Sequence, residues 1–210
     1  MNASVGLPLA GRTGYFLAPS ATASLAGIAA ACHPELVAAM LDMTDDLVRD
    51  QIGRIEIVPA PQRLYGADAA AAMAGFVHWD LSPAPYSDGT RPTFRFALDR
   101  DVAIQASARK FSAFFLATRE PRMDGAVAMT LYSMTLGDEV MDLRRHGLEE
   151  IAALVRAEAP LRSAASGFIY SDPDDPQTEW IAAFEARLIK ACAHEDIMTF
   201  GWDGRSIVVS

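Results

Sequence analysis

The stretch PYSDGTRPTFRFALDRDVAIQASARKF, residues 85–111, changes its hydrophobic pattern midway and decides the fold class. It opens with turn-forming residues, and TFRFAL (93–98) then alternates as a strand does. Asp99 or Asp101 caps a helix that we expect to run to about Thr118. The apolar positions of this helix form one core-facing stripe: Ile104, Ala108, Phe111 and Phe115. Many α/β ligand pockets begin with this passage from turn to strand to helix.

The flanking segments mix helical and strand periods in the same way. We predict one or two helices over 21–50, helices over 68–79 and 147–159, and strands over 126–136 and 167–171. Residues 52–59 read as a short strand or the approach to one, 197–210 as a closing hairpin that turns at Asp203-Gly204, and 179–189 fit both periods.

The order of these elements predicts a mixed α/β (α+β) fold, because strands and helices are interspersed without the regular alternation of a doubly wound sheet. The length of 210 residues fits one domain. We expect residues 1–20, rich in Gly, Pro and Ser, to form an N-terminal arm, and residues 21–210 to form the domain.

The composition argues against some classes of function. A net charge of −9 argues against sequence-independent binding to nucleic acid, which needs a basic face. No stretch approaches the roughly 18 apolar residues of a membrane span, and the N-terminus lacks the pattern of a secretory signal. The two cysteines, Cys32 and Cys192, fit reduced thiols in a cytoplasmic protein better than a disulfide scaffold.

Local motifs for chemistry are absent from the sequence. It contains no GxGxxG, no GxxxxGK[ST], no HExxH and no GxSxG, and its four histidines lack ligand spacing. The segment SDPDDP (171–176) places three aspartates, Asp172, Asp174 and Asp175, close enough to bind a divalent ion. Its prolines favour a solvated turn instead, so we expect no metal.

Several segments, in shared order and with near-gapless spacing, resemble the RES-domain family, which is named for an Arg, a Glu and a Ser. YSDG (86–89) is similar to the family's Arg-Phe-Ser-Asp-Gly turn except at its first residue. FFLATREP (114–121) resembles the end of the family's helix, and DLR (142–144) a later Asp-Leu-Arg. GFIY (167–170) resembles the strand before the family Ser, and WDGRSI (202–207) the terminal strand. The resemblance covers about residues 35 to 208.

The resemblance implies a fold related to ADP-ribosyltransferases and a toxin of a bacterial toxin–antitoxin module that consumes NAD, by cleaving it or by transferring ADP-ribose. It also implies a small antitoxin partner that covers the pocket. A homodimer through the apolar N-terminal helices is a further expectation, whereas direct binding to nucleic acid or to a membrane is not expected.

The three residues that name the family are replaced. The family Arg falls at Pro85, the Glu at Ala106 and the Ser at Asp172, and the neighbours of Ala106 are Gln105 and Ser107, so a slip of one residue restores no Glu. Cleavage of NAD builds positive charge on the ribose, which a carboxylate stabilises, and an arginine holds the diphosphate.

Other residues could take over these roles. Asp172, at the end of the 167–171 strand, could supply the carboxylate, and Arg95, Arg109 or Lys110 could bind phosphate. The hydroxyl and aromatic residues of the expected NAD site are Tyr86, Ser87, Phe94 and Tyr170. The alternative interpretation is that the cations are solvated surface charges and Asp172 is a turn residue.

Three functions therefore stay open. The chain is an NAD-consuming toxin with relocated catalytic residues, or a catalytically inactive RES-like protein that binds a nucleotide or a protein partner. A third reading, in which the resemblance is shallow, is an acidic α/β interaction module.

Overall fold

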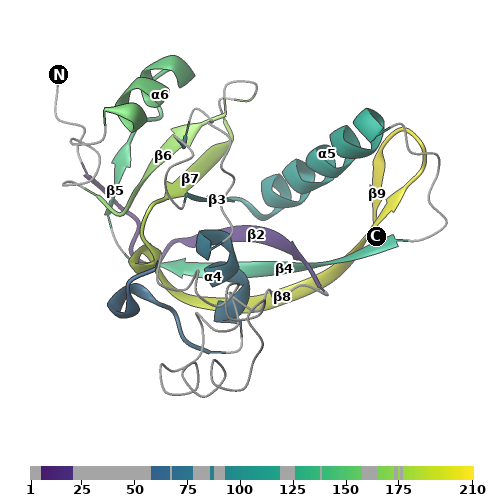
Figure 1. Ribbon diagram of the computed structural model, residues 1–210, viewed down its shortest axis with the longest axis horizontal. Helices are drawn as coiled ribbons and strands as arrows, with labels where there is room; N and C mark the ends of the chain where they lie inside the picture. The colour runs from purple at the N-terminus through teal and green to yellow at the C-terminus, as the bar shows by residue number, and fades with distance from the viewer. Residues whose placement is uncertain are drawn as a thin grey trace, which may run out of the picture.

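A computed structural model describes residues 6–20, 58–66, 68–77, 86–87, 93–118, 126–137, 139–157, 165–172, 175 and 177–210 (Figure 1). The helices expected over 21–50, most of the 52–59 segment and Pro85 lie outside these residues.

The described chain is a mixed α/β structure built on one nine-stranded sheet in the order β1-β5-β6-β7-β3-β2-β4-β8-β9. The strands are β1 (Gly6–Pro8), β2 (Thr13–Pro19), β3 (Phe94–Ala97), β4 (Ala126–Leu136), β5 (Glu139–Asp142), β6 (Gly167–Ser171), β7 (Glu179–Ala183), β8 (Ile189–Trp202) and β9 (Ile207–Val209). The helices are α4 (Ala69–Val77), α5 (Arg100–Thr118) and α6 (Leu148–Arg156), with short 3₁₀ turns η2 (Ala60–Gln62) and η3 (Ala186–Leu188). Among these strands, β5 and β6 pair in parallel and the other pairs are antiparallel.

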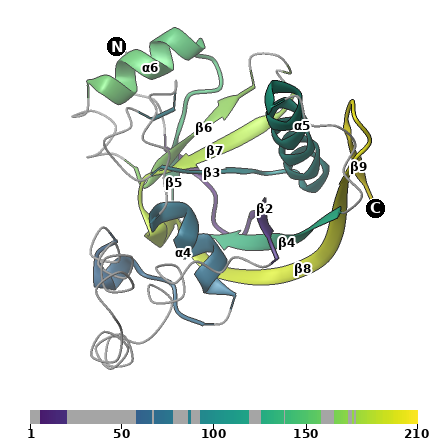
Figure 2. The same cartoon turned by 45° about the vertical axis from the view of Figure 1, so that its right-hand side comes forward.

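The sheet is almost divided at its centre. Strands β2 and β3 share one register pair, Tyr15 with Ala97, whereas β2 pairs with β4 along its whole length. Strands β3, β6 and β7 consequently diverge from β2, β4 and β8 (Figure 2).

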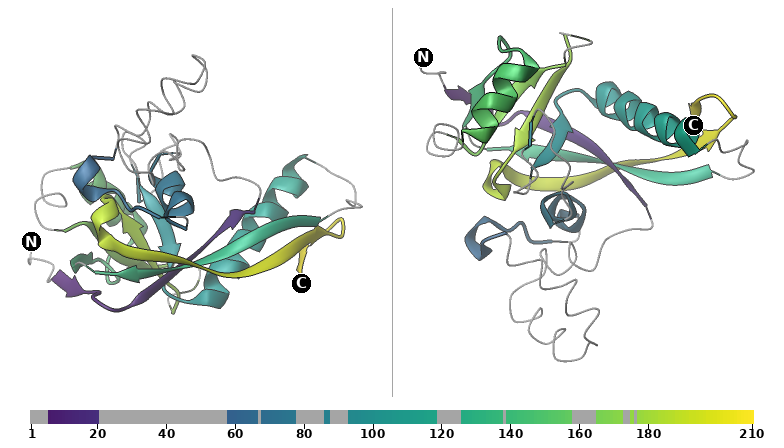
Figure 3. Two further views of the ribbon diagram at one scale, coloured as in Figure 1. Left: turned by 90° about the horizontal axis from the view of Figure 1, so that it is seen from below. Right: turned by 45° about the horizontal axis from the view of Figure 1, so that its top comes forward.

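Helices cover both faces of the sheet (Figure 3). Helix α4 buries its apolar residues against one face, in a core that includes Phe16, Phe94 and Phe96. Helix α6 and the first turns of α5 cover the opposite face of β3, β6 and β7, and the rest of α5 covers β4 and β8. The two faces of β3 therefore pack against different helices, α4 on one face and α5 and α6 on the other.

Helix α5 begins where the sequence places an N-cap. The Asp99 carboxylate accepts hydrogen bonds from the backbone N–H of Asp101 at 2.9 Å and of Val102 at 3.0 Å, so Asp99 rather than Asp101 is the cap. The predicted stripe is confirmed: Ile104, Ala108 and Phe111 pack on the β4–β8 core, and Phe115 stacks on Trp202 with ring centroids 5.3 Å apart.

The strands over 126–136 and 167–171, the helices within 68–79 and 147–159, and the closing hairpin are confirmed. The hairpin turn uses Gly204 at φ +97°, a conformation that favours glycine. The ambiguous segment 179–189 contains the strand β7 followed by η3.

The beginning of the chain differs from the expected arm. Residues Thr13–Pro19 form β2, which lies between β3 and β4 in the middle of the sheet. The side chains of β2 alternate between the two faces of the sheet: Phe16 packs in the core with α4, and Tyr15 and Leu17 pack on the opposite face. This segment therefore belongs to the sheet that carries the site. No helix in the described part of the chain is long and apolar enough to cross a membrane.

Candidate functional site

Side-chain alternation gathers one set of polar and aromatic residues on a single face of β3, β6 and β7. Neighbouring residues of a strand point to opposite faces, and residues paired across strands share a face. Tyr170 of β6 pairs with Trp180 of β7, and Trp180 pairs in turn with Ala97 of β3. Arg95, two residues before Ala97, therefore projects from the same face as Tyr170 and Trp180.

The guanidinium of Arg95 lies among three aromatic rings. Its central carbon is 3.8 Å from the ring centroid of Trp180, 5.1 Å from that of Tyr86 and 5.8 Å from that of Tyr170. Tyr86 and Tyr170 stack on each other, with centroids 6.0 Å apart. A cation within about 6 Å of an aromatic centroid is attracted by the ring quadrupole, so the rings hold the guanidinium in place.

Asp172 completes this group. Its Oδ2 accepts a hydrogen bond from the indole Nε1–H of Trp180 at 3.2 Å and lies 3.9 Å from Nη2 of Arg95. The Asp172 backbone N–H donates to the Thr178 carbonyl at 2.9 Å, which fixes the residue where β6 ends. We call Tyr86, Arg95, Tyr170, Asp172 and Trp180 the Arg95 cluster.

Two buried polar atoms of the Arg95 cluster make no hydrogen bond with the described residues: Arg95 Nε and the Tyr170 hydroxyl. Burial raises the pKa of Tyr170 well above its ordinary value, and the positive charge of Arg95 opposes part of that shift. An unsatisfied buried donor costs about 1–3 kcal/mol, and native proteins contain few such groups. The cluster therefore has hydrogen-bonding capacity that the fold does not use.

Helix α5 forms a wall beside the Arg95 cluster and brings no carboxylate to it. Val102 and Ala106 pack against the buried group that contains Tyr170 and Trp180. Gln105, which precedes Ala106, is exposed. The position where the resemblance expects a Glu thus brings only a methyl group to this side of the sheet, and the carboxylate of the Arg95 cluster is Asp172.

The structure brings together four of the residues proposed from sequence: Tyr86, Arg95, Tyr170 and Asp172. Phe94 does not join them, because it neighbours Arg95 in β3 and projects from the other face, where its ring packs 5.0 Å from Phe16 and 5.3 Å from Phe76. Ser87 is buried next to Tyr86 in the chain. Arg109 and Lys110 are exposed on α5.

Trp180 is the member of the Arg95 cluster that the sequence did not identify. It lies in the segment that fitted both helix and strand periods, so neither its strand nor its face was predicted. The usable signal was its size, since a large aromatic with a polar N–H usually finds a hydrogen-bond partner when buried. Trp180 is 5% exposed and supplies both the stacking surface for Arg95 and the donor for Asp172.

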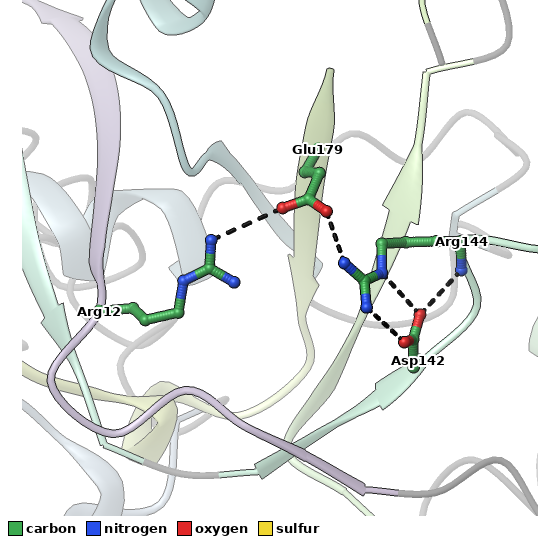
Figure 4. Close-up of polar contacts among 4 residues, drawn as sticks. All are labelled: Arg12, Asp142, Arg144 and Glu179. Atoms are coloured by element: carbon green, nitrogen blue, oxygen red, sulfur yellow. Dashed lines mark hydrogen bonds and ion pairs between the residues drawn. The ribbon is translucent and has the colours of Figure 1, made fainter. Parts of the chain in front are cut away.

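The DLR segment, in contrast, forms an ion network on the other side of β7 (Figure 4). Arg144 donates to both carboxylate oxygens of Asp142 at 2.9 and 2.6 Å and to Glu179 at 2.6 Å, and Arg12 lies 3.6 Å from Glu179. Glu179 precedes Trp180, so its side chain leaves the strand on the opposite face. The network fastens β5, the turn before β2 and the start of β7 together, behind the Arg95 cluster.

Hydrogen bonds from Arg144 shift the pKa of its partner Asp142. They hold the pKa of Asp142 below its ordinary value, against the opposing effect of burial, and the two carboxylates raise the pKa of Arg144. Both shifts favour the charged forms of Asp142 and Arg144, as expected for an ion pair that fastens strands together.

In the acidic segment after β6, the structure describes Asp172 and Asp175, and only Asp175 is exposed. Asp175 accepts hydrogen bonds from the Thr178 hydroxyl at 2.8 Å and the Gln177 backbone N–H at 3.3 Å. Within the described residues, no group of three or more His, Cys, Asp or Glu side chains could hold a metal ion. Asp174 lies outside those residues.

Comparison with known proteins adds little to this geometry. No family model matches the sequence. An uncharacterized protein of Sinorhizobium fredii, y4oC, is 23% identical over 154 residues, which are 69% of this chain and 66% of that protein. The chain thus spans less than two thirds of that relative's length, and the relative's description assigns no activity.

Proposed function

We propose that this chain is a RES-like protein that binds an NAD-type dinucleotide at the Arg95 cluster without cleaving it. One observation carries the proposal: Tyr86, Arg95, Tyr170 and Asp172, taken from three separate segments on the resemblance and the placement of charge, lie in one cluster. Ala106, where the resemblance expects the missing Glu, packs against the buried group that contains Tyr170 and Trp180. Such convergence is not expected if the four residues were independent surface and core positions.

The chemistry of the Arg95 cluster suits a nucleotide. A guanidinium donates forked hydrogen bonds to phosphate oxygens, and Arg95 keeps 33% of its side chain exposed for this contact. Aromatic rings offer flat surfaces on which a base or a nicotinamide ring stacks. The near-division of the sheet between β2 and β3 also supports a relation to the paired sheets of ADP-ribosyltransferases.

We expect no cleavage of NAD because the Asp172 carboxylate already interacts with other groups of the Arg95 cluster. The reaction needs negative charge beside the ribose carbon as the nicotinamide bond breaks. Ala106 supplies none, and the Asp172 carboxylate is already engaged by the Trp180 N–H and lies near Arg95. A carboxylate whose charge is balanced within the protein stabilises a developing cation weakly.

Isothermal titration calorimetry with NAD, combined with an assay of nicotinamide release, tests the proposal. We expect the wild-type protein to bind NAD, the Arg95→Met variant to bind at least about tenfold more weakly, and the Arg156→Met variant to bind normally, because Arg156 is exposed on α6. Nicotinamide release above a no-protein control would contradict a silent site. A wild-type protein that gives no binding heat would contradict the nucleotide site itself.

A second candidate, the NAD-consuming toxin, is favoured by the position of Asp172. Its carboxylate lies in the Arg95 cluster and its side chain is 17% exposed, so a ligand held by Arg95 would lie close to it. In this case Asp172→Ala abolishes nicotinamide release, and unchanged release would remove Asp172 from the mechanism. The same reading implies an antitoxin partner, which co-expression with the neighbouring reading frame and co-purification would test.

A further inference from the structure

The guanidinium of Arg95 combines a close aromatic contact with a buried donor that has no hydrogen-bond partner among the described residues. A guanidinium carries five N–H donors, and the buried Nε–H of Arg95 has no hydrogen-bond partner among the described residues. The nearest carboxylate oxygen, Asp172 Oδ2, is 3.9 Å away, which is an ion pair but is longer than a hydrogen bond. The aromatic rings thus surround the guanidinium, and at least its Nε–H donor has no partner among the described residues.

Buried aromatic residues form the wall behind Arg95. Trp180 is buried, its ring lies 3.8 Å from the guanidinium carbon, and its N–H is held by Asp172. Tyr170 is 2% exposed and presents a second unpartnered polar group, its hydroxyl, at the same place. A ligand that met these groups would find them already positioned, which lowers the entropy cost of binding.

We propose that a phosphate group of the ligand binds the guanidinium of Arg95 next to Asp172, so that Asp172 is a competing anion built into the site. The proposal rests on the nucleotide site described above and specifies which chemical group of the ligand enters it. Phosphate oxygens can accept the two parallel hydrogen bonds that Arg95 does not make with Asp172. The Asp172 carboxylate stays bound to the Trp180 N–H, from where it repels the arriving phosphate.

If Asp172 competes with the ligand, removal of its charge has the opposite effect on binding from that expected of a catalytic or ligand-binding residue. If Asp172 binds the ligand or assists the reaction, its neutralisation weakens binding or turnover. If Asp172 competes for Arg95, its neutralisation frees the guanidinium and removes a repulsive charge, so binding of phosphate ligands becomes tighter. Asn keeps an oxygen acceptor for the Trp180 N–H, so Asp172→Asn changes the charge with little change in the hydrogen bond.

The experiment is calorimetric titration of the full-length chain with three ligands that share phosphate and one that lacks it: NAD, ADP-ribose, inorganic pyrophosphate and nicotinamide riboside. We expect Asp172→Asn to bind each phosphate ligand about five- to tenfold more tightly, about 1 to 1.4 kcal/mol, with a smaller gain at high salt. Nicotinamide riboside shows no such gain. Asp101→Asn is the matched control, since Asp101 is an exposed carboxylate at the start of α5 and lies outside the Arg95 cluster.

The outcomes separate the two proposals. If the wild-type protein binds NAD and Asp172→Asn binds it equally or more weakly, competition by Asp172 is wrong and the nucleotide site stands. If neither protein binds any phosphate ligand, the nucleotide site is wrong and this inference with it. Asp172→Ser is a second variant in case Asn disturbs the turn, with the same expected direction and with thermal unfolding as the check of folding.

Discussion

Replacement of Arg95 by Met tests whether this arginine serves ligand binding or the stability of the fold. Met nearly preserves the length of the side chain, removes the charge and can still pack its thioether against the rings of Tyr86 and Trp180. Arg144→Met is the matched comparison, because both arginines are 33% exposed and both face carboxylates.

The structure gives the size of each effect. At Arg95 the loss is the stacking on Trp180, about 1 kcal/mol for a partly exposed site, and a 3.9 Å ion pair worth about 0–1 kcal/mol. The gain is removal of the buried, unpartnered Nε, about 1–3 kcal/mol. These terms nearly cancel, so the free energy of unfolding of Arg95→Met stays within about 1 kcal/mol of wild type.

Arg144→Met loses far more. Three short charge-assisted hydrogen bonds, at 2.9, 2.6 and 2.6 Å, disappear and leave two carboxylates facing each other's charge. Discounted for partial exposure, the expected cost is about 2 kcal/mol. Urea denaturation followed by circular dichroism measures both variants, and the Arg144→Met midpoint should fall by about 1 M.

The ranking of the two variants tests the reasoning. If Arg95→Met loses as much stability as Arg144→Met, Arg95 is a structural residue and its unpartnered Nε–H carries no functional meaning. If Arg95→Met is as stable as wild type and has lost NAD binding, the Arg95 cluster is retained for a ligand at no benefit to folding.

Three further predictions concern other parts of the molecule. Gly75→Ala in α4 should destabilise the protein in thermal unfolding although Ala is the better helix former, because the new Cβ would lie 2.4 Å from the ring of Phe94. Gly201→Ala in β8 is the control that should be nearly neutral, because the nearest atom to its new Cβ is 3.9 Å away. Hydrogen bonds from Arg144 hold the pKa of Asp142 below its ordinary value, so Asp142 stabilises the fold above about pH 4 and this stabilisation is lost as the pH falls through the folded pKa. Urea titrations of the wild type between pH 2 and 7 should show the loss. If Arg144→Met shows the same loss of stability, Asp142 is not its source. Burial raises the pKa of Cys192 to about 12, so its alkylation by iodoacetamide at pH 8, followed by mass spectrometry, should be much slower in the folded protein than in urea; equal rates would show that the thiol is accessible.

Local pattern determined most of the elements around the site. The strand β3, the cap at Asp99, the stripe along α5 and the strands β4 and β6 follow from periodicity and capping, which act over a few residues and are written in the sequence. The same reasoning could have separated Phe94 from Arg95, because neighbours in a strand leave it on opposite faces.

The tertiary structure alone decided which of these residues meet. Pairing of β7 with both β3 and β6 places Trp180 under Arg95 and beside Asp172. Strand β6 directly precedes β7, but the β3–β7 register joins segments about 80 residues apart in the chain. It also turned the N-terminal segment into the central strand β2 and sent the DLR residues to the far side of the sheet. Periodicity defines the two faces of a strand, but only the order of strands in the sheet shows which neighbours, and therefore which chemistry, each face receives.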